Sequence, residues 1–340
     1  MHILNDRNIV STLTGLTRTQ CGQLLDALSK ALIDYSNGRH ATQPAIHQPL
    51  RQSFTTAPGH TTLFMPASNT ASTGIKIVTL PGNGGAPRGS INIFSPEGDL
   101  IGLLNAEEVT AFRTALASMI PFLKCPFPKS HILVFGAGKQ AEWHVRLSLL
   151  LAGESVRGIK IFNRRSATLA ELRKRLESVQ QMHPTVNIDF VGKDTTPDYE
   201  SVLQQALADA DAIMCCTPST SPLFPSSYLT ARPKQRFISL IGSYKPEMQE
   251  VDAETLTSGT RIFVDSREAC LEEAGELIKA QISGDLLVEL GEMLVEHNIS
   301  NVDGNLVYKC VGMGIMDIVV GSQLLQIAKE IGVGQVVEDF

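Results

Sequence analysis

The chain has 340 residues, of which 43% are hydrophobic and 19% charged, with a formal net charge of −6 and a pI near 5.8. This length is enough for two hydrophobic cores, and the composition is that of an ordinary globular protein. The acidic balance and the lack of a Lys/Arg block argue against nucleic acid and anionic membranes as partners.

The first residues and the cysteines indicate a reduced, cytoplasmic protein. The sequence MHILNDRNIV carries charge and lacks the apolar region of a signal peptide. No apolar run approaches the roughly 18–20 residues that span a bilayer. The six cysteines include no C-x-x-C pair, and the eight histidines show no metal-ligand spacing. We therefore expect neither structural disulfides nor a bound metal.

Residues 1–125 predict one helix followed by an antiparallel sheet. The helix is expected near residues 21–35. Turns rich in Gly, Pro and Asn separate the strand-like runs that follow. These runs are 61–67, 74–80, 90–96 and 100–105. A second helix over 105–123 leads into the next part of the chain.

Strands and helices alternate from residue 131 to about residue 264. Strands are expected at 131–135, 159–163, 186–191, 212–216, 236–242 and 261–265, and helices at 139–153, 166–182 and 201–210. Such alternation is typical of a parallel, doubly wound sheet. A last helix over 314–332 returns toward the N-terminal part.

The segment HILVFGAGKQAEWHV places a G-x-G-x-x-A motif directly between a strand and a helix. Gly136 permits the tight turn, Gly138 lets the backbone approach a pyrophosphate, and Ala141 lets helix and strand pack closely. A purely structural corner is the alternative. Because a strand precedes the motif and a helix and second strand follow it, we predict a dinucleotide site here. Its expected residues are Gly136, Ala137, Gly138, Lys139 and Gln140.

The end of the second strand indicates which dinucleotide is bound. An NAD site usually has Asp or Glu there, to accept a hydrogen bond from the ribose. This strand ends in Asn163, Arg164 and Arg165, and guanidinium groups suit a 2′-phosphate. A solvated basic turn is the alternative, and we predict NADPH. Further candidate cofactor contacts are Thr217, Pro218 and Ser219, in the loop after a later strand, and Gly242.

Ten stretches of the chain resemble one known family. In chain order they are PLR, LFMPA, GIKIVTLPGN, EEVTAFRTA, GAGKQA, FNRR, TPS, GSYKPEMQEVD, VDSREACLEEAGEL and VYKCVGMGIMD. Together they resemble the ornithine cyclodeaminase/mu-crystallin family over nearly the whole chain. The resemblance implies an α/β homodimer in which a Rossmann domain, residues 126–312, is inserted in a discontinuous α+β domain. That second domain, residues 1–125 plus 313–340, would bind the substrate and form the dimer.

The family resemblance also implies a substrate site. The cations of PLR, KIV and FRTA surround the α-carboxylate of the substrate in that family, and the matching residues are Arg51, Lys76 and Arg113. Three cations that converge in a low-dielectric cleft need an anion, and arginine matches a carboxylate bidentately.

One position departs from the family pattern. Its cyclodeaminases carry G-A-D-x-P-G-K where this chain has GSYKPEM, so Tyr244 replaces the Asp. A phenol with a reference pKa near 10 is a poor base at neutral pH, although it can donate a proton or a hydrogen bond. Packing beside the nicotinamide is the alternative role for Tyr244. Cys310 is expected to pack rather than to act as a nucleophile.

These features favour an NADPH-dependent reductase of an imine or ketimine that bears an α-carboxylate, such as Δ1-pyrroline- or Δ1-piperideine-2-carboxylate. Lys76 is the first candidate for the catalytic proton donor and Tyr244 the second. An ornithine cyclodeaminase or an amino-acid dehydrogenase is the alternative among enzymes. A mu-crystallin-like protein that binds NADPH or a ligand is the non-enzyme alternative, and retention of Arg51, Lys76 and Arg113 favours catalysis.

Overall fold

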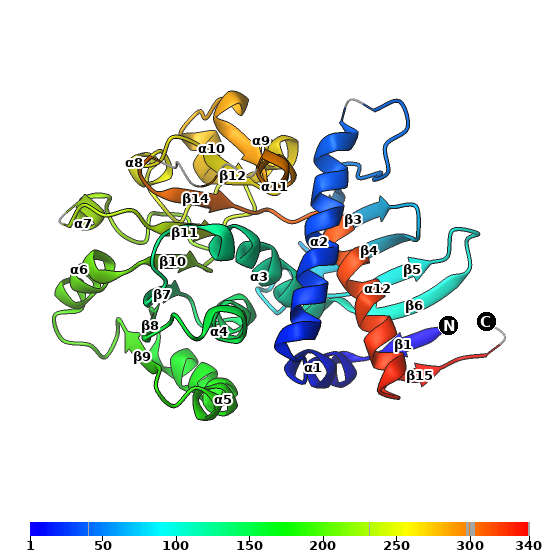
Figure 1. The fold of residues 1–340 in the computed structure, drawn as a ribbon, viewed down its shortest axis with the longest axis horizontal. Coiled ribbons are helices and arrows are strands. Elements are labelled where there is room, and N and C mark those ends of the chain that lie inside the picture. Colours follow the sequence, from blue (N-terminus) through cyan, green and yellow to red (C-terminus); the bar gives the residue numbers. More distant parts are fainter. Residues whose placement is uncertain (40, 231, 297–298, 300–302, 339–340) are drawn as a thin grey trace. The chain divides into compact units, whose positions relative to one another are not determined.

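The computed structural model describes residues 1–39, 41–230, 232–296, 299 and 303–338 (Figure 1). The chain divides into two compact units, Met1–Thr114 with Gly312–Phe340, and Ala115–Val311. The first unit is therefore assembled from both ends of the chain, around an inserted second unit. This confirms the predicted α/β class with an inserted domain. The assignment of substrate to one unit and cofactor to the other stays a prediction.

The first unit contains a seven-stranded sheet in the order β15-β1-β6-β5-β4-β3-β2. Its strands are β1 (His2–Leu4), β2 (Gln52–Thr55), β3 (Thr61–Ser68), β4 (Thr73–Leu80), β5 (Arg88–Phe94), β6 (Leu100–Asn105) and β15 (Gln335–Val336). Strands β2 to β6 pair antiparallel, and for β3 to β6 the sequence predicted this. The sequence did not indicate β1, β2 and β15, because runs of two to four residues are too short to show an alternating pattern.

Helices cover one face of this sheet (Figure 1). They are α1 (Asp6–Thr14), α2 (Arg18–Gly38) and α12 (Gly314–Glu330), while α3 (Ala106–Lys124) begins in this unit and continues into the second. The first two begin with capping boxes, at Asn5 and Thr17. Helix α12 is largely apolar and packs against β3 to β6 on one side and α2 on the other, so it forms the centre of this core.

The second unit contains an eight-stranded sheet in the order β13-β12-β14-β11-β10-β7-β8-β9, with all pairs parallel. Its strands are β7 (His131–Phe135), β8 (Gly158–Asn163), β9 (Asn187–Gly192), β10 (Ala212–Cys215), β11 (Phe237–Leu240), β12 (Ile262–Val264), β13 (Leu287–Glu289) and β14 (Leu306–Lys309). The direction of the chain across the sheet reverses between β7 and β10. Doubly wound sheets bind ligands at such a switch point, outside the carboxyl ends of the strands.

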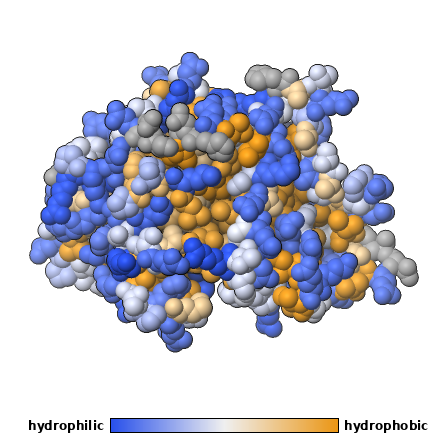
Figure 2. All heavy atoms as spheres, in the orientation of Figure 1, coloured by the Kyte–Doolittle hydropathy of each residue, from blue (hydrophilic) through white to orange (hydrophobic). Residues whose placement is uncertain are grey.

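Helices connect these strands. They are α4 (Lys139–Ala152), α5 (Ser166–Met182), α6 (Tyr199–Asp209), α7 (Ser227–Thr230), α8 (Ala253–Leu256), α9 (Arg267–Glu273), α10 (Gly275–Lys279) and α11 (Leu290–Glu296), with a 3-10 turn at Gly284–Leu286. On the face shown in Figure 2, hydrophilic residues predominate over α6 and α7. No helix in the described part of the chain is long and apolar enough to cross a membrane.

Two strands of the second sheet, β13 and β14, were missing from the sequence prediction. Strand β14 is central, between β12 and β11, although it ends in a lysine. A charged residue makes a short segment look like a surface segment in the sequence. The partner that allows this residue to be buried is distant in the chain, so the sequence does not reveal it. Lys309 has such a partner in Glu276, 3.4 Å away.

Glycine at position 74 lets α12 approach β4. A Cβ built there would lie 2.6 Å from the carbonyl oxygen of Asn92 and 2.3 Å from Cδ1 of Ile318. We expect Gly74→Ala to lower the free energy of unfolding by about 1–3 kcal/mol, because the backbone of β5 has to move. Gly22→Ala is the control, since nothing lies within 4 Å of its Cβ position in α2. Alanine there should be neutral or stabilising by up to about 1 kcal/mol. Denaturant unfolding measures both, and an unaffected Gly74→Ala variant would contradict the packing argument.

Candidate functional site

The turn between β7 and α4 has the conformation that the glycine motif predicts. Gly136 has φ +113°, and a Cβ there would lie 2.7 Å from the carbonyl oxygen of Cys216. Ala141 is fully buried. Gly138 is the N-cap of α4, and its Cβ position has no neighbour within 4 Å. The backbone at the start of α4 is therefore open to a ligand, as a pyrophosphate requires.

A buried carboxylate and an arginine from α5 brace this turn. Glu142 pairs with Arg146 at 2.9 Å and with Arg175 at 2.6 Å. Arg175 also donates from Nη2 to the carbonyl oxygen of Ala137 at 3.1 Å. Lys139 and Gln140, both partly buried, begin α4. Sequence reasoning missed Arg175, because only the packing of α5 against α4 brings it to the turn.

The end of β8 places its two arginines in solvent. Arg164 and Arg165 are exposed, while Nδ2 of Asn163 donates to the carbonyl oxygen of Arg165 at 3.0 Å and to Oγ1 of Thr168 at 2.5 Å. Arg164 and Arg165 directly precede α5, at the end of a helix where an anion is stabilised. This geometry is compatible with a 2′-phosphate and with a solvated turn.

An unexpected carboxylate lies at the same place. Asp194, which follows β9, accepts from the backbone N of Ser166 at 2.9 Å and from its Oγ at 3.2 Å. The N-cap of α5 is Arg165, so Asp194 binds the first residue of the helix. Because Asp194 is brought in by β9, no local motif signals it. An acidic group near the arginines weakens the argument for NADPH that rested on the lack of one.

The loops after β10 and β11 meet at Glu250. Its Oε1 accepts from N and Oγ1 of Thr217 at 2.7 and 2.9 Å, and its Oε2 accepts from N of Gly242 at 2.7 Å. A Cβ at Gly242 would lie 1.9 Å from the carbonyl oxygen of Thr217, so glycine is required. Pro218 is exposed, and Ser219 accepts from N of Gln249 at 2.7 Å. The structure thus brings the predicted Thr217 and Gly242 together, through a residue the sequence did not single out.

Tyr244 and Cys310 differ in their surroundings. Tyr244 is partly exposed after β11, with Nζ of Lys245 at 6.0 Å from its ring centroid. Cys310 is 1% exposed, and its Sγ donates to Oδ2 of Asp265 at 3.2 Å. A thiol buried beside a carboxylate is a poor nucleophile, because both features disfavour the thiolate.

Two of the three predicted cations of the first unit share one carboxylate. Nζ of Lys76, on β4, lies 2.7 Å from Oδ2 of Asp317, and Nε of Arg113, on α3, lies 3.0 Å from Oδ1. All three side chains are at most 3% exposed. The chain therefore supplies part of the anion that these cations need. Asp317 was missed, although it is the last residue of the VYKCVGMGIMD stretch.

The start of α12 is built around this cluster. Gly312 has φ +89°, and a Cβ there would lie 2.6 Å from Nη1 of Arg113. Oε1 of Gln48 accepts from N of Ile315 at 2.7 Å, which ties the segment that carries Arg51 to the first turn of α12. Arg51 is partly buried.

Neighbouring charges and burial set the pKa of Lys76. Burial and the charges of Arg113 and Arg51 lower it to about 8, against the attraction of Asp317. The charges of Lys76, Arg113 and Arg51 therefore act on one another, and such a group of cations favours an anion beside it. A lysine with a pKa near 8 can also exchange a proton close to neutral pH.

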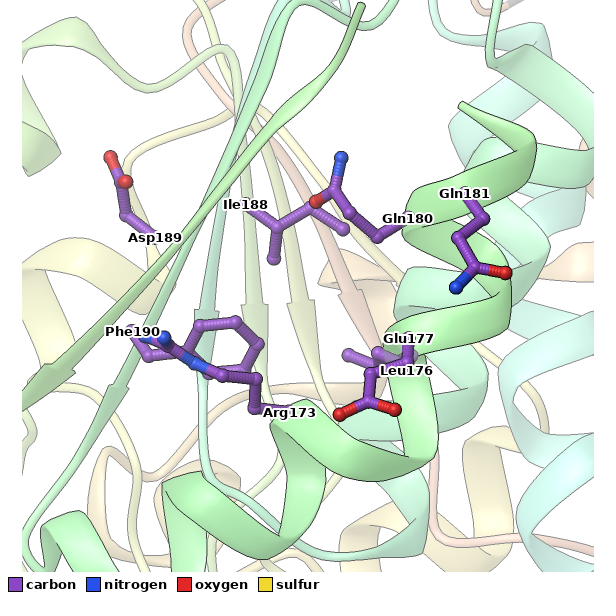
Figure 3. Close-up of a pocket in the computed structure, with 8 residues that line it drawn as sticks. All are labelled: Arg173, Leu176, Glu177, Gln180, Gln181, Ile188, Asp189 and Phe190. Atoms are coloured by element: carbon purple, nitrogen blue, oxygen red, sulfur yellow. The ribbon is translucent and has the colours of Figure 1, made fainter. Parts of the chain in front are cut away.

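A groove between α5 and β9 shows none of this chemistry (Figure 3). Its lining is Arg173, Leu176, Glu177, Gln180, Gln181, Ile188, Asp189 and Phe190. Cζ of Arg173 lies 4.7 Å from the centroid of the Phe190 ring. The groove follows the later turns of α5 and not the helix start, where the predicted cofactor residues lie. In the described residues, no group of three or more His, Cys, Asp or Glu could hold a metal ion.

Comparison with known proteins identifies the family. The profile of the ornithine cyclodeaminase/mu-crystallin family matches residues 8–330. The chain belongs to the ornithine cyclodeaminase/mu-crystallin family. The resemblance stated from the sequence is therefore confirmed. An uncharacterized family relative from Saccharomyces cerevisiae is 32% identical over 78% of this chain and 80% of its own length.

Other relatives of the family carry names that describe an activity. The ketimine reductase mu-crystallin of Mus musculus is 28% identical over 87% of this chain and 89% of its own. The Δ1-pyrroline-2-carboxylate reductase of Thermococcus litoralis, solved with NADH and L-proline, aligns with a TM-score of 0.81 at 19% identity, over 99% and 100% of the two chains. An archaeal alanine dehydrogenase dimer with bound NAD aligns with a TM-score of 0.80 at 19% identity, over 100% and 99%. At such identities the structures show the shared fold alone.

We expect Asp317→Asn to destabilise the protein strongly. The substitution keeps the shape but leaves Lys76 and Arg113 without their shared charge, and breaking a buried pair costs about 3–5 kcal/mol. Asp34→Asn is the control, because Asp34 pairs with a lysine that is 76% exposed. Such a surface pair contributes about 0.3–0.5 kcal/mol. Denaturant unfolding at pH 7 measures both, and equal small losses would show that Asp317 is not the counter-ion of the cluster.

Proposed function

We propose that this chain is an NAD(P)H-dependent reductase of imines that carry an α-carboxylate, with NADPH as the preferred coenzyme. Cyclic imino acids such as Δ1-pyrroline-2-carboxylate and Δ1-piperideine-2-carboxylate are the proposed substrates. The buried cluster of Lys76, Arg113 and Asp317 carries the proposal, because it holds two buried cations together and lowers the pKa of the lysine. The names of the mouse and Thermococcus litoralis proteins support it.

The proposed coenzyme site lies in the second unit. The open backbone at Gly138 and the start of α4 would hold the pyrophosphate. The loops of Thr217 and Gly242, at the carboxyl ends of β10 and β11, would border the nicotinamide. When bound, the reduced nicotinamide supplies the hydride. Arg164 and Arg165 would contact a 2′-phosphate.

The proposed substrate site lies in the first unit. Arg113 and Arg51 would bind the carboxylate of the imino acid, with Arg113 held by Asp317 on its Nε side. Lys76 would donate the proton to the imine nitrogen. Protonation is needed because the carbon of the C=N bond accepts hydride readily only when the nitrogen is protonated. Fixing the carboxylate and this nitrogen at once orients the substrate, so the residues act mostly by positioning.

The chain supports the alternative functions less well than it supports imine reduction. Cyclodeamination of ornithine requires a base for water and proton transfer, and Tyr244 replaces the aspartate of the family motif. An amino-acid dehydrogenase would use the same fold, as the archaeal alanine dehydrogenase does. A binding protein without activity would have no need for a buried lysine paired with a carboxylate, at the desolvation cost this entails.

We further propose a homodimer formed through the sheet of the first unit. One face of β3 to β6 packs on α12, whereas residues of the other face stay partly exposed and include both apolar and polar side chains. Pro66, Ile75, Asn92 and Leu103 share one row across the strands of that face, and three of the four are apolar. A second copy would remove this surface from water.

The predicted cytoplasmic location accords with six free thiols.

Coenzyme oxidation by the purified protein tests the function. We expect steady consumption of NADPH with either cyclic imino acid and none without it, and little ammonia from ornithine with NAD⁺. Coenzyme binding without turnover of any imino acid would favour the binding-protein alternative. Conversion of ornithine to proline would replace the reductase by a cyclodeaminase.

Arg164→Ala tests the choice of coenzyme. If Arg164 contacts the 2′-phosphate, its loss should raise the KM for NADPH about 10- to 100-fold, because a charge-assisted contact contributes roughly 1.5–3 kcal/mol. The KM for NADH should stay nearly unchanged. Arg157→Ala, just before the opposite end of the same strand, is the control. Equal effects of Arg164→Ala on both coenzymes would mean that this residue does not read the phosphate.

The pH profile tests the proton donor. With the pKa of Lys76 lowered to about 8, its protonated fraction falls as the pH rises through 8. We therefore expect kcat/KM for a cyclic imino acid to fall above about pH 8. Lys76→Arg keeps the positive charge to higher pH and should remove this fall in whatever activity survives, whereas Tyr244→Phe should leave it in place. A profile altered by Tyr244→Phe instead would make Tyr244 the donor.

A further inference from the structure

One buried carboxylate joins the loops that follow β10 and β11. Glu250 is fully buried and accepts three hydrogen bonds, two from Thr217 and one from the backbone of Gly242. Each of its oxygens serves a different loop. The carboxylate therefore fixes the direction of two backbone N–H groups at the carboxyl ends of neighbouring strands.

A buried lysine and a second carboxylate stand next to Glu250. Lys309, at the end of β14, lies 3.4 Å from Glu276 on α10 and donates to the carbonyl oxygen of Ser243. Its charge also attracts Glu250, whereas Glu276 repels it. Lys309 thereby binds the loop after β11 at Ser243. The charge of Glu250 also acts on the thiols of Cys215, the last residue of β10, and Cys216, which follows it.

Backbone bonds already fasten these loops to the fold. N of Gln249 donates to the carbonyl oxygen of Ser219 at 2.7 Å, and N of Leu223 donates to that of Glu250 at 2.8 Å. Burying two carboxylates and a lysine costs desolvation free energy that a merely structural contact would not require. The groups they orient lie where doubly wound sheets bind ligands.

We propose that Glu250 is a positioning residue whose ionised carboxylate holds the Thr217 and Gly242 loops in the arrangement that binds the nicotinamide coenzyme. The proposal rests on the proposed function in one respect, since it takes these loops to border the coenzyme. Glu250 itself acts through Thr217 and Gly242 and contacts no reacting atom.

Protonation of Glu250 would loosen this arrangement. Burial raises its pKa to about 7, although Lys309 and the backbone N–H groups favour the charged form. Below that pH one oxygen carries a proton and turns from an acceptor into a donor that faces another donor. Coenzyme affinity should therefore fall as the pH drops through 7. Cys215, Cys216 and Lys309 keep their protons across this range, because the pKa of each is raised above its ordinary value.

Direct binding of NADH, followed by its fluorescence without any imine substrate, tests the proposal. NADH is the probe because it lacks a 2′-phosphate, whose own pKa near 6 would confuse the profile. We expect wild-type protein to bind NADH at least about fivefold more weakly at pH 6 than at pH 8.

Three variants complete the experiment. Glu250→Gln should weaken NADH binding about 5- to 100-fold at pH 8, since an NH₂ group then faces a backbone N–H, and should abolish the pH dependence. Glu250→Asp keeps a carboxylate and should restore part of that dependence. Glu247→Gln, an exposed carboxylate in the same segment, should change neither property. Thermal unfolding checks that each variant is folded.

The outcomes separate this inference from the proposed function. Equal affinity of wild-type protein at both pH values, or a folded Glu250→Gln variant that binds NADH normally, would overturn the inference and leave the reductase proposal standing. Failure of wild-type protein to bind either coenzyme at any pH would overturn both. If Glu250→Gln does not fold, the wild-type profile and Glu250→Asp decide the matter.

Discussion

The ion pairs of Asp317 with Lys76 and Arg113 are the contacts on which the first unit depends. An unpaired buried charge costs several kcal/mol, so a lysine in a central strand and an arginine on a helix are tolerated only with a partner. Asp317 is that partner, and it occupies the first turn of α12, where the helix dipole favours a negative charge. The same helix forms the core over the sheet. Packing of α12 therefore places the counter-ion, and the counter-ion allows the cations to be buried.

Buried carboxylates play the same part in the second unit. Glu142 and Glu250 are buried near the carboxyl ends of the strands. Glu142 pairs with two arginines, and Glu250 accepts hydrogen bonds from Thr217 and Gly242. Glu142 links α4 to α5, and Glu250 links the loops after β10 and β11. In both units a single buried charge thus connects segments that are distant in the sequence. Rigid placement of binding groups is what a catalyst that works mostly by positioning requires.

How far the sequence predicts this structure depends on the range of the interactions. The glycine turn at Gly136 and the helix over 166–182 could be predicted, because a motif or periodicity lies within one segment. The family resemblance, carried by stretches along the whole chain, supplied Lys76 and Arg113. Asp317, Asp194 and Arg175 were missed, since each is brought to its partner by tertiary packing alone. Strand β14 was missed for the same reason, because its buried lysine finds partners on other elements.

The contacts that sequence reasoning missed also change the chemical argument. From the sequence, three cations required an external anion, and a carboxylate substrate was the natural choice. Asp317 satisfies part of that requirement from within, so the proposed binding of a carboxylate rests on Arg113, Lys76 and Arg51 together, whose charges act on one another. The same carboxylate raises the pKa of Lys76 against a larger effect of burial, which leaves it near 8. A buried lysine with a carboxylate of its own would have a higher pKa and would hold its proton too tightly. A buried lysine with no carboxylate would have a lower pKa and would lose its proton. A shared counter-ion gives the intermediate pKa that the proposed proton donation by Lys76 near neutral pH requires.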